Sequence, residues 1–204
     1  MRRSKFWMLP VFLGILSLSI FGVTMAVYDH WMKIDNEFDT ADAKVYIDEK
    51  FDPDDKWVPG EEKEKKVWFG NDGDVDTVLR VKFSPELKLK DGTQVTDKEV
   101  LDSFSLNFSS GFSGDWTAGD DGWYYYNKVL RSAEKTDCTL ESVTVSDLIG
   151  SDVRGSNTDY SAAVFTVNVE SEMIQALQAA DIAEEKGWAM TPTVSDGSVS
   201  WKTR

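Results

Sequence analysis

Histidine and cysteine are almost absent from this sequence of 204 residues, which contains one of each, His30 and Cys138. One cysteine excludes a disulfide within the chain, and the two residues are too few for HExxH or Cys/His zinc sites. Ser-His-Asp chemistry would have to use His30, and no Ser or Asp constellation accompanies it in the sequence. We therefore expect no catalytic residue, no metal site and no cofactor.

Basic residues are also scarce, because 22 Lys and Arg stand against 36 Asp and Glu, which gives a net charge of -14. This acidic balance disfavours phosphate contacts, so we expect no nucleic-acid partner. Aromatic residues reach 12%, with eight Trp, which indicates a folded protein. The length predicts one ordinary domain.

The N-terminus has the pattern of an export signal. Three of the first five residues are basic, and no charged residue occurs between positions 6 and 23. Thr24 and Ala26 fit the minus-three and minus-one positions of a signal peptidase site. The sequence therefore predicts a signal peptide over residues 1–26 and secretion of the mature chain. A retained anchor is the alternative, because residues 6–28 are long enough to span a bilayer.

Residues 27–42 mix acidic residues with apolar anchors, and we expect them to form an arm ahead of the folded domain. The anchors are Tyr28, Trp31, Met32, Ile34 and Phe38. The simpler alternative is a leader or first strand that folds onto its own domain.

Short runs with an alternating apolar pattern predict strands in the remainder of the chain. These runs cover residues 44–51, 65–69, 77–83, 141–146 and 161–169. In one of them Leu79, Val81 and Phe83 share a face, as a half-buried strand requires. Turn residues separate the runs. We predict a mainly β fold over residues 43–204, an antiparallel jelly-roll-like sandwich with one or two short helices.

Two helices are expected between the strands. Thr96 followed by Glu99 forms a capping box that predicts a helix over residues 96–104. An approximate apolar stripe predicts a second helix over residues 172–186, which ends before Gly187.

Residues 109–122 are rich in Gly, Ser and Asp and are expected to form a mobile surface loop, with Phe112 and Trp116 as possible anchors. The aromatic run 123–126 is interpreted as half core and half surface, in preference to a carbohydrate-stacking strip.

Acidic runs at residues 52–55, 72–76 and 120–121 offer oxygen ligands for Ca²⁺. None has the EF-hand spacing, so we interpret them as turn formers on a solvated face. Cys138 is either a surface thiol that can cross-link or a buried, inert residue.

Three clusters of residues carry a resemblance to a known family. They are Lys56 to Glu61 with 65–69, Asn71, Gly73 and 76–81; the run DGWYYYNKVL over 121–130; and Glu170 and 174–176 with Gly187-Trp188. Their order and spacing resemble the TasA and camelysin family, in its clostridial-type branch. The resemblance covers most of the mature chain.

This resemblance implies an extracellular jelly-roll subunit, processed by a dedicated signal peptidase, that polymerises with itself into biofilm matrix or pilus-like fibres. Accessory matrix subunits are possible further partners. It also implies that residues 27–42 act as a donor strand, because an unpaired sheet edge can accept a strand from a neighbour.

Two other functions compete with the fibre subunit. One is a monomeric cell-surface adhesin or Ca²⁺-binding module. The other is a secreted protease, a label given to the camelysin branch. We disfavour the protease because the sequence has no HExxH and no GxSxG motif.

Overall fold

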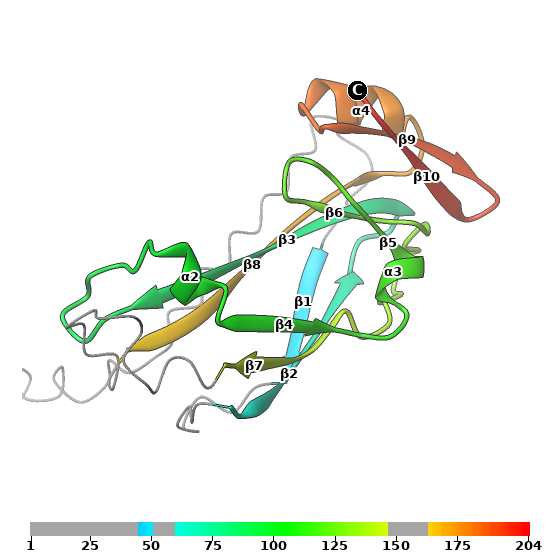
Figure 1. Cartoon of the computed structure of the whole chain (residues 1–204). Helices are drawn as coiled ribbons and strands as arrows, with labels where there is room; N and C mark the ends of the chain where they lie inside the picture. The colour runs from blue at the N-terminus through cyan, green and yellow to red at the C-terminus, as the bar shows by residue number, and fades with distance from the viewer. Residues whose placement is uncertain (1–44, 51–59, 147–162) are drawn as a thin grey trace, which may run out of the picture.

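The computed structural model describes residues 45–50, 60–146 and 163–204 (Figure 1). The predicted signal peptide and arm therefore lie outside the described residues. The strands are β1 (Val45–Lys50), β2 (Glu62–Asn71), β3 (Thr77–Lys88), β4 (Phe104–Phe108), β5 (Trp116–Ala118), β6 (Tyr124–Tyr126), β7 (Leu140–Val145), β8 (Val164–Gln175), β9 (Met190–Ser195) and β10 (Ser198–Thr203). The helices are α2 (Lys98–Leu101), α3 (Phe112–Asp115) and α4 (Ala179–Glu185).

Eight of the strands form two four-stranded antiparallel sheets, with the orders β1-β2-β7-β4 and β5-β6-β3-β8. The alternation in the sequence sends every second side chain of each strand into the space between the sheets. The main core there contains Val45, Val67, Phe69, Leu140 and Val143 from the first sheet and Leu79, Val81, Phe83, Trp116, Tyr126, Val167, Val169 and Met173 from the second. The predicted antiparallel β sandwich is confirmed.

The strand order matches a jelly roll in the inner strands only. A jelly roll is a sandwich of eight strands in which β1 would lie beside β8 and β5 beside β4. Here the orders β2-β7-β4 and β6-β3-β8 agree with that scheme, whereas β1 lies beside β2 and β5 beside β6. Two of the four edge strands, β1 and β5, therefore belong to the opposite sheet from the one a jelly roll assigns them.

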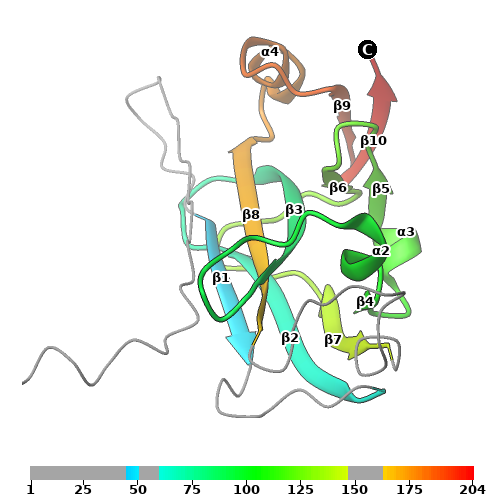
Figure 2. The same cartoon turned by 60° about the vertical axis from the view of Figure 1, so that its left-hand side comes forward.

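The C-terminal part of the chain covers the outer face of the second sheet. Strands β9 and β10 pair as a hairpin, and this hairpin and α4 lie together at one end of the sandwich (Figure 1, Figure 2). A second core joins them to β3, β6 and β8 through Val78, Tyr125, Ile174, Ala179, Ala183, Trp188, Met190 and Val199. The second sheet is thus buried on both faces over part of its length.

The helix predicted over residues 172–186 is wrong in its first part. Residues up to Gln175 continue β8, and α4 contains only Ala179–Glu185. Pairing with β3 continues to the end of β8, where Gln175 lies opposite Thr77. Ladder hydrogen bonds and burial on both faces outweigh the approximate helical stripe here. The predicted end is confirmed, because Gly187 has a φ of 67° and follows the helix.

The helix predicted over residues 96–104 is shorter than expected. It covers Lys98–Leu101, and its N-cap is Asp97, whose side chain accepts a hydrogen bond from the N–H of Glu99. An aspartate one residue later thus supplies the cap expected from Thr96. The chain leaves the helix because Phe104 begins β4, where it pairs with Val145.

The segment 109–122 contains regular structure, contrary to the surface loop predicted there. It includes α3 and β5, and β5 pairs with β6. The two anchors are confirmed, because Trp116 is 6% exposed in the core and Phe112 packs against the same core. Aromatic burial outweighs the polar composition of the segment.

Candidate functional site

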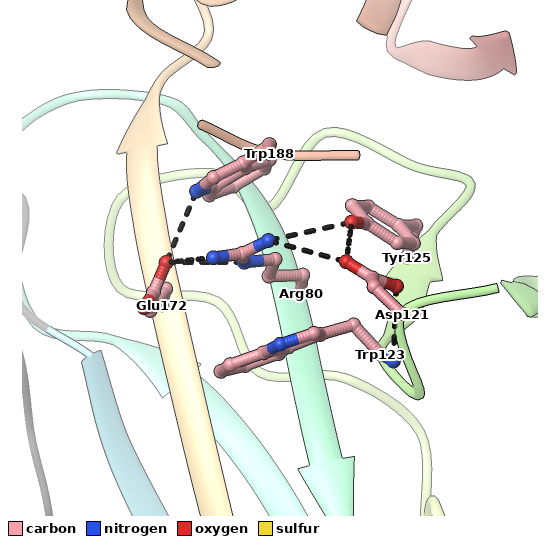
Figure 3. A network of polar contacts seen from close by, with 6 residues as sticks. All are labelled: Arg80, Asp121, Trp123, Tyr125, Glu172 and Trp188. Carbon is pink, nitrogen blue, oxygen red and sulfur yellow. Dashed lines mark hydrogen bonds and ion pairs between the residues drawn. The ribbon is translucent and has the colours of Figure 1, made fainter. Parts of the chain in front are cut away.

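Residues from distant parts of the chain converge on Arg80 of β3, on the outer face of the second sheet (Figure 3). We name this group the Arg80 clasp; it consists of Arg80, Asp121, Trp123, Tyr125, Glu172 and Trp188. Arg80 comes from the first of the three sequence clusters, residues 121–125 from the second, and Trp188 from the third. Glu172 belongs to none of them and lies on β8.

The guanidinium of Arg80 uses each of its three nitrogens. Nε and Nη2 donate to Oε2 of Glu172 at 3.0 and 2.7 Å. Nη1 donates to the hydroxyl of Tyr125 at 3.3 Å and lies 3.6 Å from Oδ2 of Asp121. Trp188 donates its indole N–H to the same oxygen of Glu172 at 3.0 Å. These ion pairs and hydrogen bonds join β3, β6 and β8 to the C-terminal unit, by which we mean α4, the β9–β10 hairpin and the residues between them.

Two indole rings enclose the guanidinium plane. Its central carbon lies 4.2 Å from the ring centroid of Trp123 and 4.7 Å from that of Trp188. Arg80 is only 7% exposed, so these cation–π contacts act largely outside water. A lysine at this position would keep the charge and lose both the stacking and the forked hydrogen bonds.

Tyr125 and Asp121 complete the clasp on the β6 side. The hydroxyl of Tyr125 donates to Oδ2 of Asp121 at 2.6 Å. Burial, together with this hydrogen bond, raises the pKa of Tyr125 to about 12, so the phenol keeps its proton at physiological pH. Oδ1 of Asp121 accepts the N–H of Trp123 at 3.2 Å, which fixes the turn between β5 and β6.

That turn depends on Gly119. Its N–H donates to the carbonyl of Trp123 at 2.8 Å. A Cβ at this position would lie 2.5 Å from Oδ1 of Asp121 and 2.7 Å from a ring carbon of Tyr125, which is fully buried. The glycine lets the chain approach the clasp this closely.

Gly119→Ala is expected to lower the free energy of unfolding by about 1 to 3 kcal/mol, because the added methyl group overpacks a buried ring. The measurement is urea unfolding followed by tryptophan fluorescence. Gly114→Ala is the matched control, because no atom lies within 4 Å of a Cβ there and alanine favours the helix α3. Equal stability of the two variants would contradict the packing described for the clasp.

The contacts of the clasp are ion pairs, hydrogen bonds and cation–π contacts within the protein. Arg80 is balanced by Glu172, and Asp121 adds a second carboxylate beside it. An indole ring covers each face of the guanidinium, and each of its three nitrogens donates a hydrogen bond to Glu172 or Tyr125. The arrangement holds β3, β6, β8 and the C-terminal unit in one relative position.

The open edge of β8 is a second candidate site. Within the described residues β8 pairs with β3 alone, and β1 pairs with β2 alone. The two strands β1 and β8 approach each other on the same side of the sandwich (Figure 2). The described structure therefore presents a sheet edge beside β1, at the place where a jelly roll would pair the two strands.

The backbone of β8 shows which residues face this edge. Just after β8, Ala176 donates its N–H to the carbonyl of Asp76, at the end of the β3 ladder. In an antiparallel ladder the two backbone groups of a residue point to the same side, and the side alternates along the strand. Ala176 faces β3, and by this alternation the even-numbered residues of β8 do so as well. Ser171 and Met173 have odd numbers and therefore direct their backbone groups away from β3.

The residues predicted for the signal peptidase site and the donor arm all fall outside the described residues. They are Thr24, Ala26, Tyr28, Trp31, Met32, Ile34 and Phe38. His30 and the acidic run 52–55 lie outside as well. In the ranges that the structure describes, no group of His, Cys, Asp and Glu is arranged to hold a metal ion.

The aromatic run 123–126 alternates between two sides as predicted, but the surface half of the prediction is wrong, because the second core covers the outer side. Tyr124 and Tyr126 pack with the core between the sheets, whereas Tyr125 belongs to the second core. Cys138 is partly buried and donates its thiol to the carbonyl of Leu140. Burial raises the pKa of this thiol, which lowers its reactivity.

Arg80 and Glu172 were missed by sequence reasoning. The alternating pattern places Arg80 on a polar face, and the apolar stripe places Glu172 in a helix. One signal was present, because Val78 and Ile174 are apolar residues on the face opposite to the main core. Apolar residues on both faces of a strand indicate a second covering layer.

Comparison of the sequence with models of known protein families and with curated proteins finds no match. None of the helices in the described ranges has the length and apolar character needed to cross a membrane.

Proposed function

We propose that this chain is a secreted, non-enzymatic structural subunit that polymerises into extracellular fibres by donating its arm, residues 27–42, to the next molecule. The observation that carries the proposal is the edge of β8, which has one strand partner in the described structure. Such an edge is a template for an added strand, and its inward side chains offer a site for alternate residues of that strand.

The dimensions agree with this proposal. β8 has 12 residues and pairs over its full length with β3, so the strand is about 40 Å long. The arm, residues 27–42, ends shortly before β1 and has 16 residues, enough to pair along the whole of β8. Addition of one molecule's arm to the next molecule's edge does not close on itself, so it produces a filament.

The Arg80 clasp supports a structural function. It fixes the C-terminal half of β8 from the outer face of the sheet, through Glu172. A strand held in this way keeps its edge in an extended conformation, which lowers the entropy lost when another strand pairs with it.

The test is electron microscopy of two purified forms, residues 27–204 and residues 43–204. We expect fibres from the first and dispersed, folded monomers from the second. Circular dichroism with thermal unfolding shows whether the shorter form is folded. Fibres from both forms would refute arm donation, and monomers from both at all concentrations would favour a monomeric adhesin.

A further inference from the structure

Ser171 is a polar residue in the apolar core between the sheets. It lies on β8 between Val169 and Met173, which both belong to the main core. It is 1% exposed, and its hydroxyl has no hydrogen-bond partner in the described structure. A buried hydroxyl without a partner is unfavourable, so a hydrogen-bond partner from outside this part of the chain would stabilise it.

The position of Ser171 allows a strand added at the edge to supply that partner. Its backbone groups point away from β3, so an added antiparallel strand would pair with Ser171 directly. Directly opposed residues place their side chains on the same face of a sheet, close enough for a hydrogen bond. The partner must therefore be a polar residue on the inward face of the added strand.

The arm has such residues when it is read as an extended strand. Alternate positions then share one face, and they are Tyr28, His30, Met32, Ile34, Asn36 and Phe38. Four of these six residues are large and apolar, so this is the face that a donor strand would bury. Asn36 lies between Ile34 and Phe38 and is the polar residue nearest the domain among the six.

We infer that Asn36 of a neighbouring molecule's arm lies opposite Ser171 and hydrogen-bonds to its hydroxyl, which fixes the register of strand donation. This inference rests on the proposed function. The strands are antiparallel, as in every ladder of the described sheets. Ile34 then lies opposite Met173 and Phe38 opposite Val169, so apolar residues meet the main core on both sides of the polar pair.

The same register also gives the positions of Trp31 and His30. Trp31 lies on the other face, opposite Ala176, which packs against the second core. His30 falls beyond β8, opposite Leu177, which is 78% exposed. A shifted register with His30 opposite Ser171 would place Trp31 opposite the charged Glu170 instead.

One feature opposes this register. Asp35 would lie opposite Glu172 and Glu37 opposite Glu170 on the outer face, and opposed like charges weaken strand pairing. Arg80 already balances the charge of Glu172. Salt screens the remaining repulsion, so fibres should form more readily as ionic strength rises.

Disulfide trapping tests the register in the full mature chain. Asn36→Cys and Ser171→Cys are combined with Cys138→Ser, which removes the native thiol. We expect mild oxidation of assembled protein to give a ladder of covalent multimers on a non-reducing gel. Two matched pairs serve as controls, with Asp35→Cys or His30→Cys in place of Asn36→Cys, and neither should give a ladder.

A second measurement does not depend on disulfide geometry. Asn36→Ala leaves Ser171 buried without a partner and should raise the concentration needed for fibres about tenfold, whereas His30→Ala should leave it unchanged. Three results would each overturn the register. They are a ladder of covalent multimers with His30→Cys, a cross-link within one monomer, and equal effects of Asn36→Ala and His30→Ala on fibre formation. If the register fails but wild-type fibres still require the arm, the proposed function stands. If no wild-type fibres require the arm, the register and the proposed function are both refuted.

Discussion

Replacement of Arg80 by methionine is expected to lower the free energy of unfolding by about 3 to 5 kcal/mol. The variant keeps most of the aliphatic volume of the side chain and removes the charge that balances Glu172. Glu172 and Asp121, whose side chains are 22% and 25% exposed, then remain as carboxylates without a balancing cation, and two indole rings lose their cation contact. Urea unfolding followed by tryptophan fluorescence measures the loss.

Two further variants separate the clasp from a general effect of charge. Arg131→Met removes a surface arginine whose side chain is 62% exposed and paired with Glu134, so it should change stability by less than about 1 kcal/mol. Glu172→Gln combined with Arg80→Met removes one orphaned charge and should recover part of the stability. Equal losses for Arg80→Met and Arg131→Met would show that the clasp contributes nothing beyond a surface ion pair.

The sheet strands with a clean alternation could be predicted from the sequence. In β3, Leu79, Val81 and Phe83 face the main core, as the pattern indicates. The outer face was harder to predict, because Arg80 is of a residue type that is usually exposed and is buried here between Trp123 and Trp188. Burial of a charged side chain depends on its partners, and these are 41 to 108 positions away in the sequence.

The C-terminal hairpin was not predicted, although one local signal was present. Strands β9 and β10 have only six residues each, and Pro192 lies inside β9, where a proline argues against a strand. The turn between them is Asp196-Gly197, and both residues have positive φ, 51° and 81°. An Asp-Gly pair between strands is typical of a tight hairpin.

In the candidate sites, residues that lie close together in the sequence could be predicted as a group, whereas contacts between distant segments could not. The glycines and aromatic residues of 119–125 could be recognised as a motif, because they lie together in the chain. Their meeting with Glu172 and Trp188 could not be, because it follows from the pairing of β3 with β8 and the packing of the second core. Non-local contacts of this kind leave no periodic trace in the sequence.

The second large effect is expected in the arm, where Trp31→Asp combined with Ile34→Asp should abolish fibres and leave a folded monomer. Each large apolar side chain contributes about 1.5 to 3 kcal/mol when it is buried. Ordering the arm costs conformational entropy at every residue, so it becomes favourable only when an acceptor edge buries these anchors. Two aspartates remove the burial term and add charges that must stay hydrated.

Electron microscopy and thermal unfolding of this double variant test both parts of the expectation. Lys33→Asp is the matched control, because it changes the net charge by the same -2 and retains both anchors. We expect fibres from the control and none from the double variant, with the same cooperative thermal transition in both. Fibres that persist in the double variant would exclude arm donation. Loss of its thermal transition would show that residues 27–42 stabilise their own domain, because a donated arm contributes nothing to the core of the molecule that carries it.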